Sequence, residues 1–134
     1  MRNFFLLGLF LGICLSVQHS WGSTQNLVCQ PESNLKDRIL ISLSDSQSGT
    51  LVYSPDSEAT QTKLALKRGT SPADQAVFTT AYQSGKANIQ FIVQIPASQI
   101  MTTSIQLVGS LTTQITELQS SETQKLTCTS KLSN

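Results

Sequence analysis

ANIQFIVQI, residues 87–95, is the stretch of sequence that decides the fold class. Every second residue in it is large and apolar, and Gln90 and Gln94 flank Ile92 on the opposite face. A period of two residues is typical of a β-strand with one face in the core. An apolar residue on the second face as well favours a central position in the sheet. The residues predicted to face the core are Ile89, Phe91, Val93 and Ile95.

Strand-like runs extend outward from this segment in both directions. Residues 76–83 precede it, and Ser84-Gly85-Lys86 between the two predicts a hairpin. Gly and Pro residues separate further short apolar runs along the chain, which is typical of an all-β domain. The further predicted strands are residues 38–44, 50–53, 61–68 and 124–130, with Ile39, Ile41, Leu43, Leu64, Leu66, Leu126 and Cys128 facing inward and Leu40, Lys63, Ala65 and Lys67 facing outward. We therefore expect one all-β domain, a small antiparallel barrel or sandwich of about eight or nine strands.

Residues 98–119 admit two interpretations. The segment is rich in β-branched residues and has a central Gly109, which favours a hairpin about Gly109-Ser110 that pairs Ile105 and Leu107 with Leu111 and Ile115. We prefer the hairpin because the composition and the all-β context agree. The helix stays open, because apolar residues also recur at helical spacing at Met101, Ile105, Val108, Leu111, Ile115 and Leu118.

Residues 1–22 have the pattern of a cleaved signal peptide. Met1 and Arg2 form a short positive region, an apolar run follows from Phe4 to Val17, and Ser20-Trp21-Gly22 places small residues at the −3 and −1 positions of a cleavage site. This apolar run is shorter than the roughly 20 residues that a membrane-spanning helix needs.

The mature chain is therefore expected to be residues 23–134, a single β-rich domain. We expect it to be secreted, periplasmic or extracellular, without membrane insertion after the signal is removed. The alternative is a lipoprotein anchored through Cys14. Ile13 argues against it, because the cysteine that carries a lipid normally follows a small residue.

Two cysteines remain after cleavage, Cys29 near the start of the mature chain and Cys128 near its end. An even pair in an exported chain predicts a disulfide. Such a bond requires the first and last strands to lie within about 6 Å at their Cα atoms. A reactive thiol pair and a metal site are the alternatives, and neither is favoured by two cysteines so far apart, without His and outside a C-x-x-C motif.

The composition excludes several kinds of chemistry. The formal net charge is +1, which gives no basis for a nucleic-acid partner. Residues 23–134 contain no His, since His19 lies in the predicted signal peptide. Ser-His-Asp and Cys-His catalysis and His-ligated zinc are thereby excluded for the mature chain. We predict no catalytic, cofactor-binding or metal-ligating residue.

Two short motifs are interpreted as turns. Ser33-Asn34-Leu35-Lys36 matches the S-x-x-K pattern of serine acyl-enzymes, but the companion motifs of those enzymes are absent. Ser84-Gly85-Lys86 matches the end of a phosphate-binding loop, but Thr80 stands where the upstream glycine is needed.

The remaining candidate side chains are carboxylates and aromatic rings. Asp45, Asp56 and Glu58 could supply a carboxylate pair or a weak calcium site, although turn hydrogen bonding is the favoured interpretation. Phe78 and Phe91 are expected in the core. Tyr53 and Tyr82 are expected to point outward, too few to form a sugar- or base-binding platform.

The 30 residues from Ala87 to Thr116 carry no charge. A polar but uncharged outer face needs no partner, yet low charge with high β-propensity also favours self-association. We expect an exported, non-enzymatic module that binds an unidentified protein, in the manner of an inhibitor. The alternative is a structural or surface component that self-associates through residues 87–116, and an enzyme is the third possibility.

The overall plan, an exported β-rich domain with one disulfide, resembles small periplasmic barrels that inhibit lysozyme. The resemblance is one of architecture and implies an inhibitor-like function. The inhibitor loop of those proteins has a Ser-x-Ser-Gly-x-x-Tyr stretch. Residues Tyr82-Gln83-Ser84-Gly85-Lys86 differ from it in order and spacing, so the residues identify no family.

Overall fold

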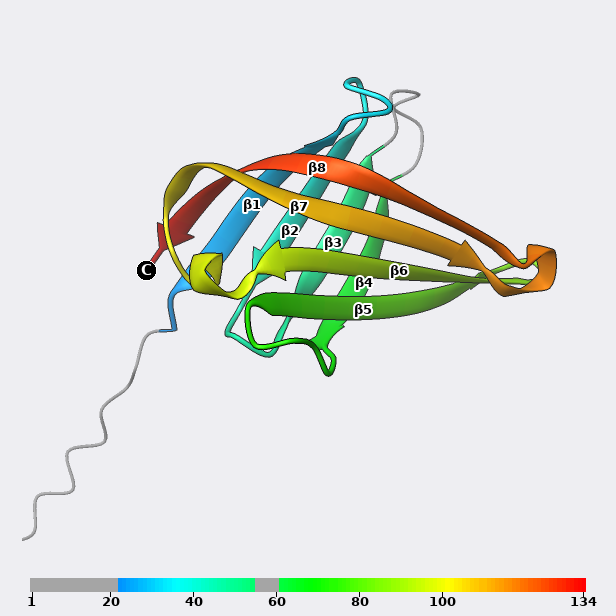
Figure 1. Cartoon of the computed structure of the whole chain (residues 1–134), viewed down its shortest axis with the longest axis horizontal. Helices are drawn as coiled ribbons and strands as arrows, with labels where there is room; N and C mark the ends of the chain where they lie inside the picture. Colours follow the sequence, from blue (N-terminus) through cyan, green and yellow to red (C-terminus); the bar gives the residue numbers. More distant parts are fainter. Residues whose placement is uncertain (1–21, 55–60) are drawn as a thin grey trace, which may run out of the picture.

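Eight antiparallel strands close into a barrel in which each strand pairs with its neighbours in sequence and the last pairs with the first (Figure 1). The computed structural model describes residues 22–54 and 61–134. No helix in those ranges is long and apolar enough to cross a membrane. The elements are β1 (Thr24–Pro31), β2 (Arg38–Leu43), β3 (Ser48–Ser54), β4 (Thr62–Arg68), β5 (Gln75–Ser84), β6 (Ala87–Pro96), β7 (Ser104–Ile115) and β8 (Ser120–Ser133), with 3₁₀ turns η1 (Ala97–Gln99) and η2 (Thr116–Leu118).

Pairing of β1 with β8 closes the barrel, and the disulfide lies within that pairing. Cys29 stands directly opposite Cys128, with the two Cα atoms 4.0 Å apart and a bond between the sulfur atoms. Both side chains are buried in the interior. The predicted all-β fold, the strand number and the disulfide between the first and last strands are therefore confirmed, and the fold is a barrel rather than a sandwich.

The core consists of one alternating set of side chains from each strand. The strands are half polar and half apolar in a period of two, so closing the sheet collects the apolar set inside. The inward-facing prediction is confirmed for β2, β6 and β8, and β6 is central, paired with β5 and β7. The buried apolar residues are Leu27, Cys29, Ile39, Ile41, Leu43, Leu51, Leu66, Ala76, Phe78, Phe91, Val93, Ile95, Leu107, Leu111, Leu126 and Cys128.

The structure corrects the prediction for residues 98–119. Most of this segment is the single strand β7, so both the hairpin about Gly109-Ser110 and the helix are wrong. Gly109 lies mid-strand, where an added Cβ would stand 2.6 Å from the backbone oxygen of Gln94 on β6. A glycine inside a strand often marks such a close backbone approach rather than a turn. Ile105, predicted to pair inside a hairpin, is 92% exposed beside an irregularity in the β7–β8 register.

One end of the barrel is closed by the segment from η1 to the start of β7. Gln25, fully buried, donates from Nε2 to the backbone oxygens of Gln99 and Thr102 at 2.7 and 2.9 Å. Its Oε1 accepts the backbone N–H of Met101 at 2.7 Å. Ser130 on β8 completes the network through the Nε2 group of Gln25 and the Thr102 oxygen. A buried amide whose hydrogen bonds are all made holds the segment in place.

The other end is formed by two long hairpins, β5–β6 and β7–β8, which extend beyond β1–β4 in Figure 1. The β5–β6 hairpin turns at Gly85, whose φ of 62° lies in the left-handed region that glycine favours. Two donors of Asn88, the backbone N–H and the side-chain Nδ2, bind the Glu117 carboxylate at 2.8 Å. This contact joins the tips of the two hairpins. The hydrogen bond from the Asn88 backbone is the largest cause that lowers the pKa of Glu117, and the side-chain bond acts in the same direction.

Reduction of the disulfide is expected to destabilise the domain strongly. The bond closes a loop across 99 positions, and removing a native disulfide from a small domain costs about 2–5 kcal/mol. Denaturant titration of oxidised and reduced protein, monitored by far-UV circular dichroism, measures the difference in the free energy of unfolding. Thiol labelling of the oxidised protein in denaturant provides the control. Two reactive thiols in protein that was never reduced would contradict the pairing.

Candidate functional site

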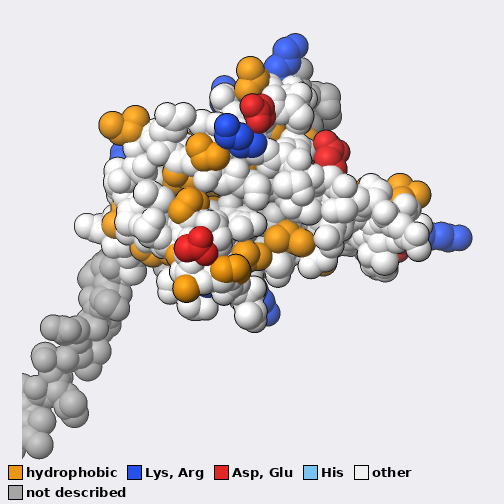
Figure 2. Space-filling model, viewed as in Figure 1, with side chains coloured by type: hydrophobic (Ala, Val, Ile, Leu, Met, Phe, Trp, Pro, Cys, Tyr) orange, Lys and Arg blue, Asp and Glu red, His pale blue; other side chains and the backbone are white. Residues whose placement is uncertain are grey.

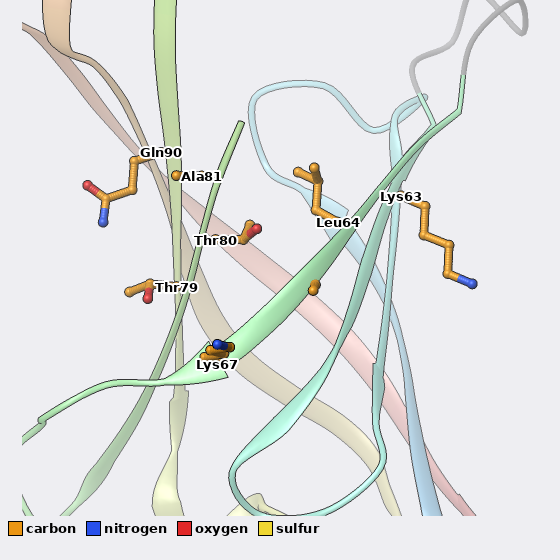
Figure 3. A pocket seen from close by; sticks show the side chains of 8 residues that line it. Lys63, Leu64, Lys67, Thr79, Thr80, Ala81 and Gln90 are labelled. Carbon is orange, nitrogen blue, oxygen red and sulfur yellow. The ribbon is translucent and has the colours of Figure 1, made fainter. Parts of the chain in front are cut away.

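The barrel wall is incompletely paired between β4 and β5. These strands pair only at Lys67–Thr79 and Arg68–Phe78, whereas β5 and β6 pair along their whole length from Gln75–Pro96 to Ser84–Ala87. From Lys67 back toward Thr62, β4 diverges from β5, as Figure 3 shows. We call the space between residues 62–66 of β4 and residues 80–84 of β5 the β4–β5 opening.

The backbone of the opening faces an unfilled position in the sheet. The Arg68 N–H donates to the Gln47 oxygen beside β3, and the Gly69 N–H donates to the Val77 oxygen of β5. Backbone groups of successive residues in a strand point to opposite neighbours. The N–H and C=O groups of Lys63 and Ala65 therefore point toward β5, and by the same alternation those of Ala81 and Gln83 point toward β4.

A pocket of about 420 Å³ occupies the opening. In Figure 3 the side chains of Leu64 and Thr80 point into the space between the strands, whereas Lys63 projects from the other side of β4. The volume lies within the range of about 300–1,000 Å³ that ligand sites have. The pocket is lined by Lys63, Leu64, Ala65, Lys67, Thr79, Thr80, Ala81 and Gln90.

Aromatic and aliphatic side chains lie on the inner side of this part of the wall. Tyr53, Leu64, Tyr82 and Ile89 are partly buried against the core. The rings of Tyr82 and Phe91 stack with their centroids 5.8 Å apart. The prediction that Phe78 and Phe91 fill the core is confirmed. The prediction that both tyrosines point outward is wrong, because each occupies an inward position of its strand and packs on the core.

Tyr53 connects this apolar region to the loop before β2. Its hydroxyl donates to Asp37 Oδ2 at 2.7 Å. Partial burial is the largest cause that raises the pKa of Tyr53 to about 12, and the hydrogen bond and charge of Asp37 and the nearby Tyr82 phenol act in the same direction. The phenol is therefore neutral and serves as a hydrogen-bond donor over the whole physiological range.

The charged side chains that the structure describes around the opening are positive. Lys63 and Lys67 are exposed on the outer face of β4, while β5 and β6 contain no charged residue. Arg68, at the end of β4, donates to the Ser46 backbone oxygen at 3.0 Å. Figure 2 shows that charged side chains are scattered over the face in view. Lys63 and Lys67, with no acidic residue on β4, β5 or β6, make a local positive rim.

The structure places the two short motifs of the sequence in turns. Residues 33–36 lie between β1 and β2, and residues 84–86 lie at the β5–β6 turn, where β5 and the opening end. Asn34 accepts the Lys36 backbone N–H at 3.2 Å through Oδ1, and Ser33 donates to the Gln124 side chain on β8. Residues 84–87 form the β5–β6 hairpin turn as expected.

Of the three candidate carboxylates, the structure describes only Asp45. Asp45 accepts the backbone N–H groups of Gln47 and Ser48 at 2.7 and 2.8 Å within the β2–β3 turn, and these bonds lower the pKa of its carboxyl. Asp56 and Glu58 lie outside the described residues. Among residues 22–54 and 61–134, no group of three or more His, Cys, Asp or Glu side chains could hold a metal ion.

Sequence reasoning found the outward lysines of β4 and its inward leucines, all confirmed, but not the opening that they border. No residue type signals where a strand stops pairing. The structure shows incomplete burial on the inward face of β4: Leu66 alone is fully buried, whereas Leu64 is half-buried.

Comparisons with known proteins leave the site to be judged on its own geometry: no protein-family model, no curated protein sequence and no solved structure matches this chain.

Alkaline pH is expected to destabilise the folded protein through Tyr53. A phenol whose pKa is raised from 10 to about 12 by folding contributes stability that is complete below pH 10 and is lost as the pH rises to about 12. Tyr53→Phe lacks this contribution. The stability difference between wild type and Tyr53→Phe, measured by denaturant titration, should therefore shrink over this interval.

Tyr82→Phe is the matched control, because it keeps Tyr53 and its bond to Asp37 and should retain the alkaline loss. A difference between wild type and Tyr53→Phe that stays constant across this interval would contradict the assignment.

Proposed function

We propose that this protein is exported and that its mature part is a non-enzymatic module that binds another protein through the β4–β5 opening. The pattern of residues 1–22 supports export, as does the disulfide between Cys29 and Cys128, a bond that persists in oxidising compartments.

The incomplete pairing of β4 with β5 is the observation that carries the proposal. It leaves backbone donors and acceptors beside apolar side chains in a pocket of about 420 Å³. Proteins normally protect unpaired strand edges, because such edges pair readily with another chain. The edge at the β4–β5 opening therefore offers a surface on which a partner strand can pair.

The chemistry of the described residues favours binding over catalysis. Asp45 and Glu117, whose pKa values are lowered, use their carboxylates to hold a turn and a hairpin contact. The phenol of Tyr53 is kept protonated. A general acid or base needs a pKa near the working pH, and these shifts lead away from it.

Covering the opening should abolish partner binding. Ala65 and Ala81 are exposed and small, and an extended β4–β5 register would place them opposite each other. Ala65→Arg with Ala81→Glu introduces two long side chains of opposite charge that can pair across the opening. Affinity capture with immobilised oxidised residues 23–134, from envelope and secreted fractions of the source organism, is expected to recover a stoichiometric partner with wild type and to lose most of it with this variant.

Thr112→Arg with Thr123→Glu is the matched control. These outward residues stand opposite each other in the part of the β7–β8 wall that pairs continuously, from Leu107–Cys128 to Ile115–Ser120. The same side chains are therefore added without covering an edge. Equal capture by both variants would refute the opening as the binding surface.

A second candidate function is self-association through residues 87–116. Residues 89–94 of β6 pair with both β5 and β7, and residues 110–115 of β7 pair with both β6 and β8. Association through these parts would therefore use the outer face rather than a strand edge. That face carries an uncharged row in which Thr79, Ile92 and Thr112 are cross-strand neighbours, and regular uncharged β-surfaces stack readily.

Charge on this face should prevent such assembly. Gln90→Lys with Gln94→Lys places two like charges on the outer face of β6 and is expected to give a monomer at concentrations where wild type assembles. Sedimentation equilibrium measures the assembly state, and circular dichroism confirms the fold. Assembly that persists in the folded variant would rule out this face.

A further inference from the structure

We propose that the occupant of the β4–β5 opening is an extended acidic segment of a partner protein, which pairs with β4 as an added strand and directs alternate carboxylates toward Lys63 and Lys67. This inference rests on the proposed function and adds the chemistry of the partner.

The backbone of β4 defines the shape of the occupant. Leu64 and Leu66 pair with Leu51 and Gly49 of β3, and their N–H and C=O groups point to that side. The N–H and C=O groups of Lys63 and Ala65 point into the opening, two residues apart along one edge. Only a chain in extended conformation repeats its hydrogen-bonding groups at this spacing, which is how β-strand addition works.

The side chains of β4 define which residues the added strand carries. On the outer face, the position opposite Lys63 lies next to an ammonium group. The position opposite Ala65 lies diagonally between Lys63 and Lys67, at a distance of about 7–8 Å that long side chains can span. Ala65 and Ala81 are small and leave room there. Both outer positions therefore favour Glu or Asp.

The inner positions favour apolar residues. An added residue opposite Leu64 points into the barrel, where Leu64 and Thr80 line the pocket and Tyr82 and Ile89 pack on the core. The pattern that fits the opening is therefore acidic–apolar–acidic–apolar, at least four residues long.

The charges also exclude other occupants. Lysines on an exposed edge oppose pairing with a strand of the same charge. A second copy of β4 would place its own Lys63 and Lys67 against those of the first. The strands of this chain that are most apolar, such as β6, are uncharged and offer the lysines no partner.

A labelled peptide of sequence GEVEVEVG tests the inference by fluorescence anisotropy with oxidised residues 23–134. We expect binding that weakens as salt is raised toward about 0.5 M, because rim charges are screened. Lys63→Glu with Lys67→Glu should weaken binding at least about tenfold, which corresponds to about 1.4 kcal/mol. The matched control Lys125→Glu with Lys131→Glu makes the same charge change on exposed positions of β8 and should change binding less than about twofold.

Two altered peptides separate strand addition from charge attraction. GKVKVKVG keeps the shape and reverses the charge. The N-methylated form of GEVEVEVG keeps the side chains and removes backbone donors. Both should bind at least about tenfold more weakly. In the complex, amide exchange at Lys63 and Ala65 should slow, whereas amides already paired with β3, such as Leu64, should change little.

Equal binding of the three peptides, or no binding of GEVEVEVG, overturns the acidic-strand inference. The proposed function is tested separately, by the amount of partner recovered in the affinity capture. If capture is lost with Ala65→Arg/Ala81→Glu but unaffected by Lys63→Glu/Lys67→Glu, the opening binds a protein of different chemistry. If capture is unaffected by both, the opening is not the binding surface.

Discussion

The pairing of β1 with β8 is the constraint on which the rest of this structure depends. Every other strand pair joins neighbours in sequence, and this one joins the two ends of the domain. Closure converts an open sheet with two edges into a wall around a common interior. It also gives the alternating side chains a single core, and the Cys29–Cys128 bond fixes the closure covalently within the pairing.

The opening follows from how the wall is divided once it has closed. Strands β2, β3 and β4 are short, whereas β5 to β8 are long and belong to two hairpins whose tips are joined through Asn88 and Glu117. β4 follows β3, and β5 follows β6 toward those tips. The two parts of the wall therefore separate where β4 meets β5, and backbone groups there stay without a partner strand.

Much of the fold could be predicted because it depends on local alternation. The inward sets of β2, β4, β6 and β8 follow from residue spacing. The pairing of Cys29 with Cys128 follows from the two cysteines that remain in residues 23–134. The turn predicted at Gly109 was wrong because glycine occurs both in turns and at close backbone contacts. Only the position of Gln94 in the neighbouring strand shows that Gly109 is a close contact.

The candidate site could not be predicted, for a related reason. Lys63, Ala65 and Ala81 look like ordinary outward residues, and their importance comes from the register at which β4 and β5 stop pairing. Gln25 is similar, since nothing in the sequence around it indicates a buried amide that holds η1 and the following turn. Both features arise from contacts between distant segments, which residue patterns do not encode.

The placement of the two cysteines also determines an order of events during synthesis. Cys29 leaves the ribosome 99 residues before Cys128, a delay of roughly 5–20 s at ordinary elongation rates. During that time the first half of the barrel wall can assemble hairpin by hairpin, but it cannot close. The only other thiol available to Cys29 within the chain is Cys14, which lies in the predicted signal peptide. Removal of that peptide would leave Cys29 with Cys128 as its one possible partner within the chain, so the composition of residues 23–134 by itself selects this bond.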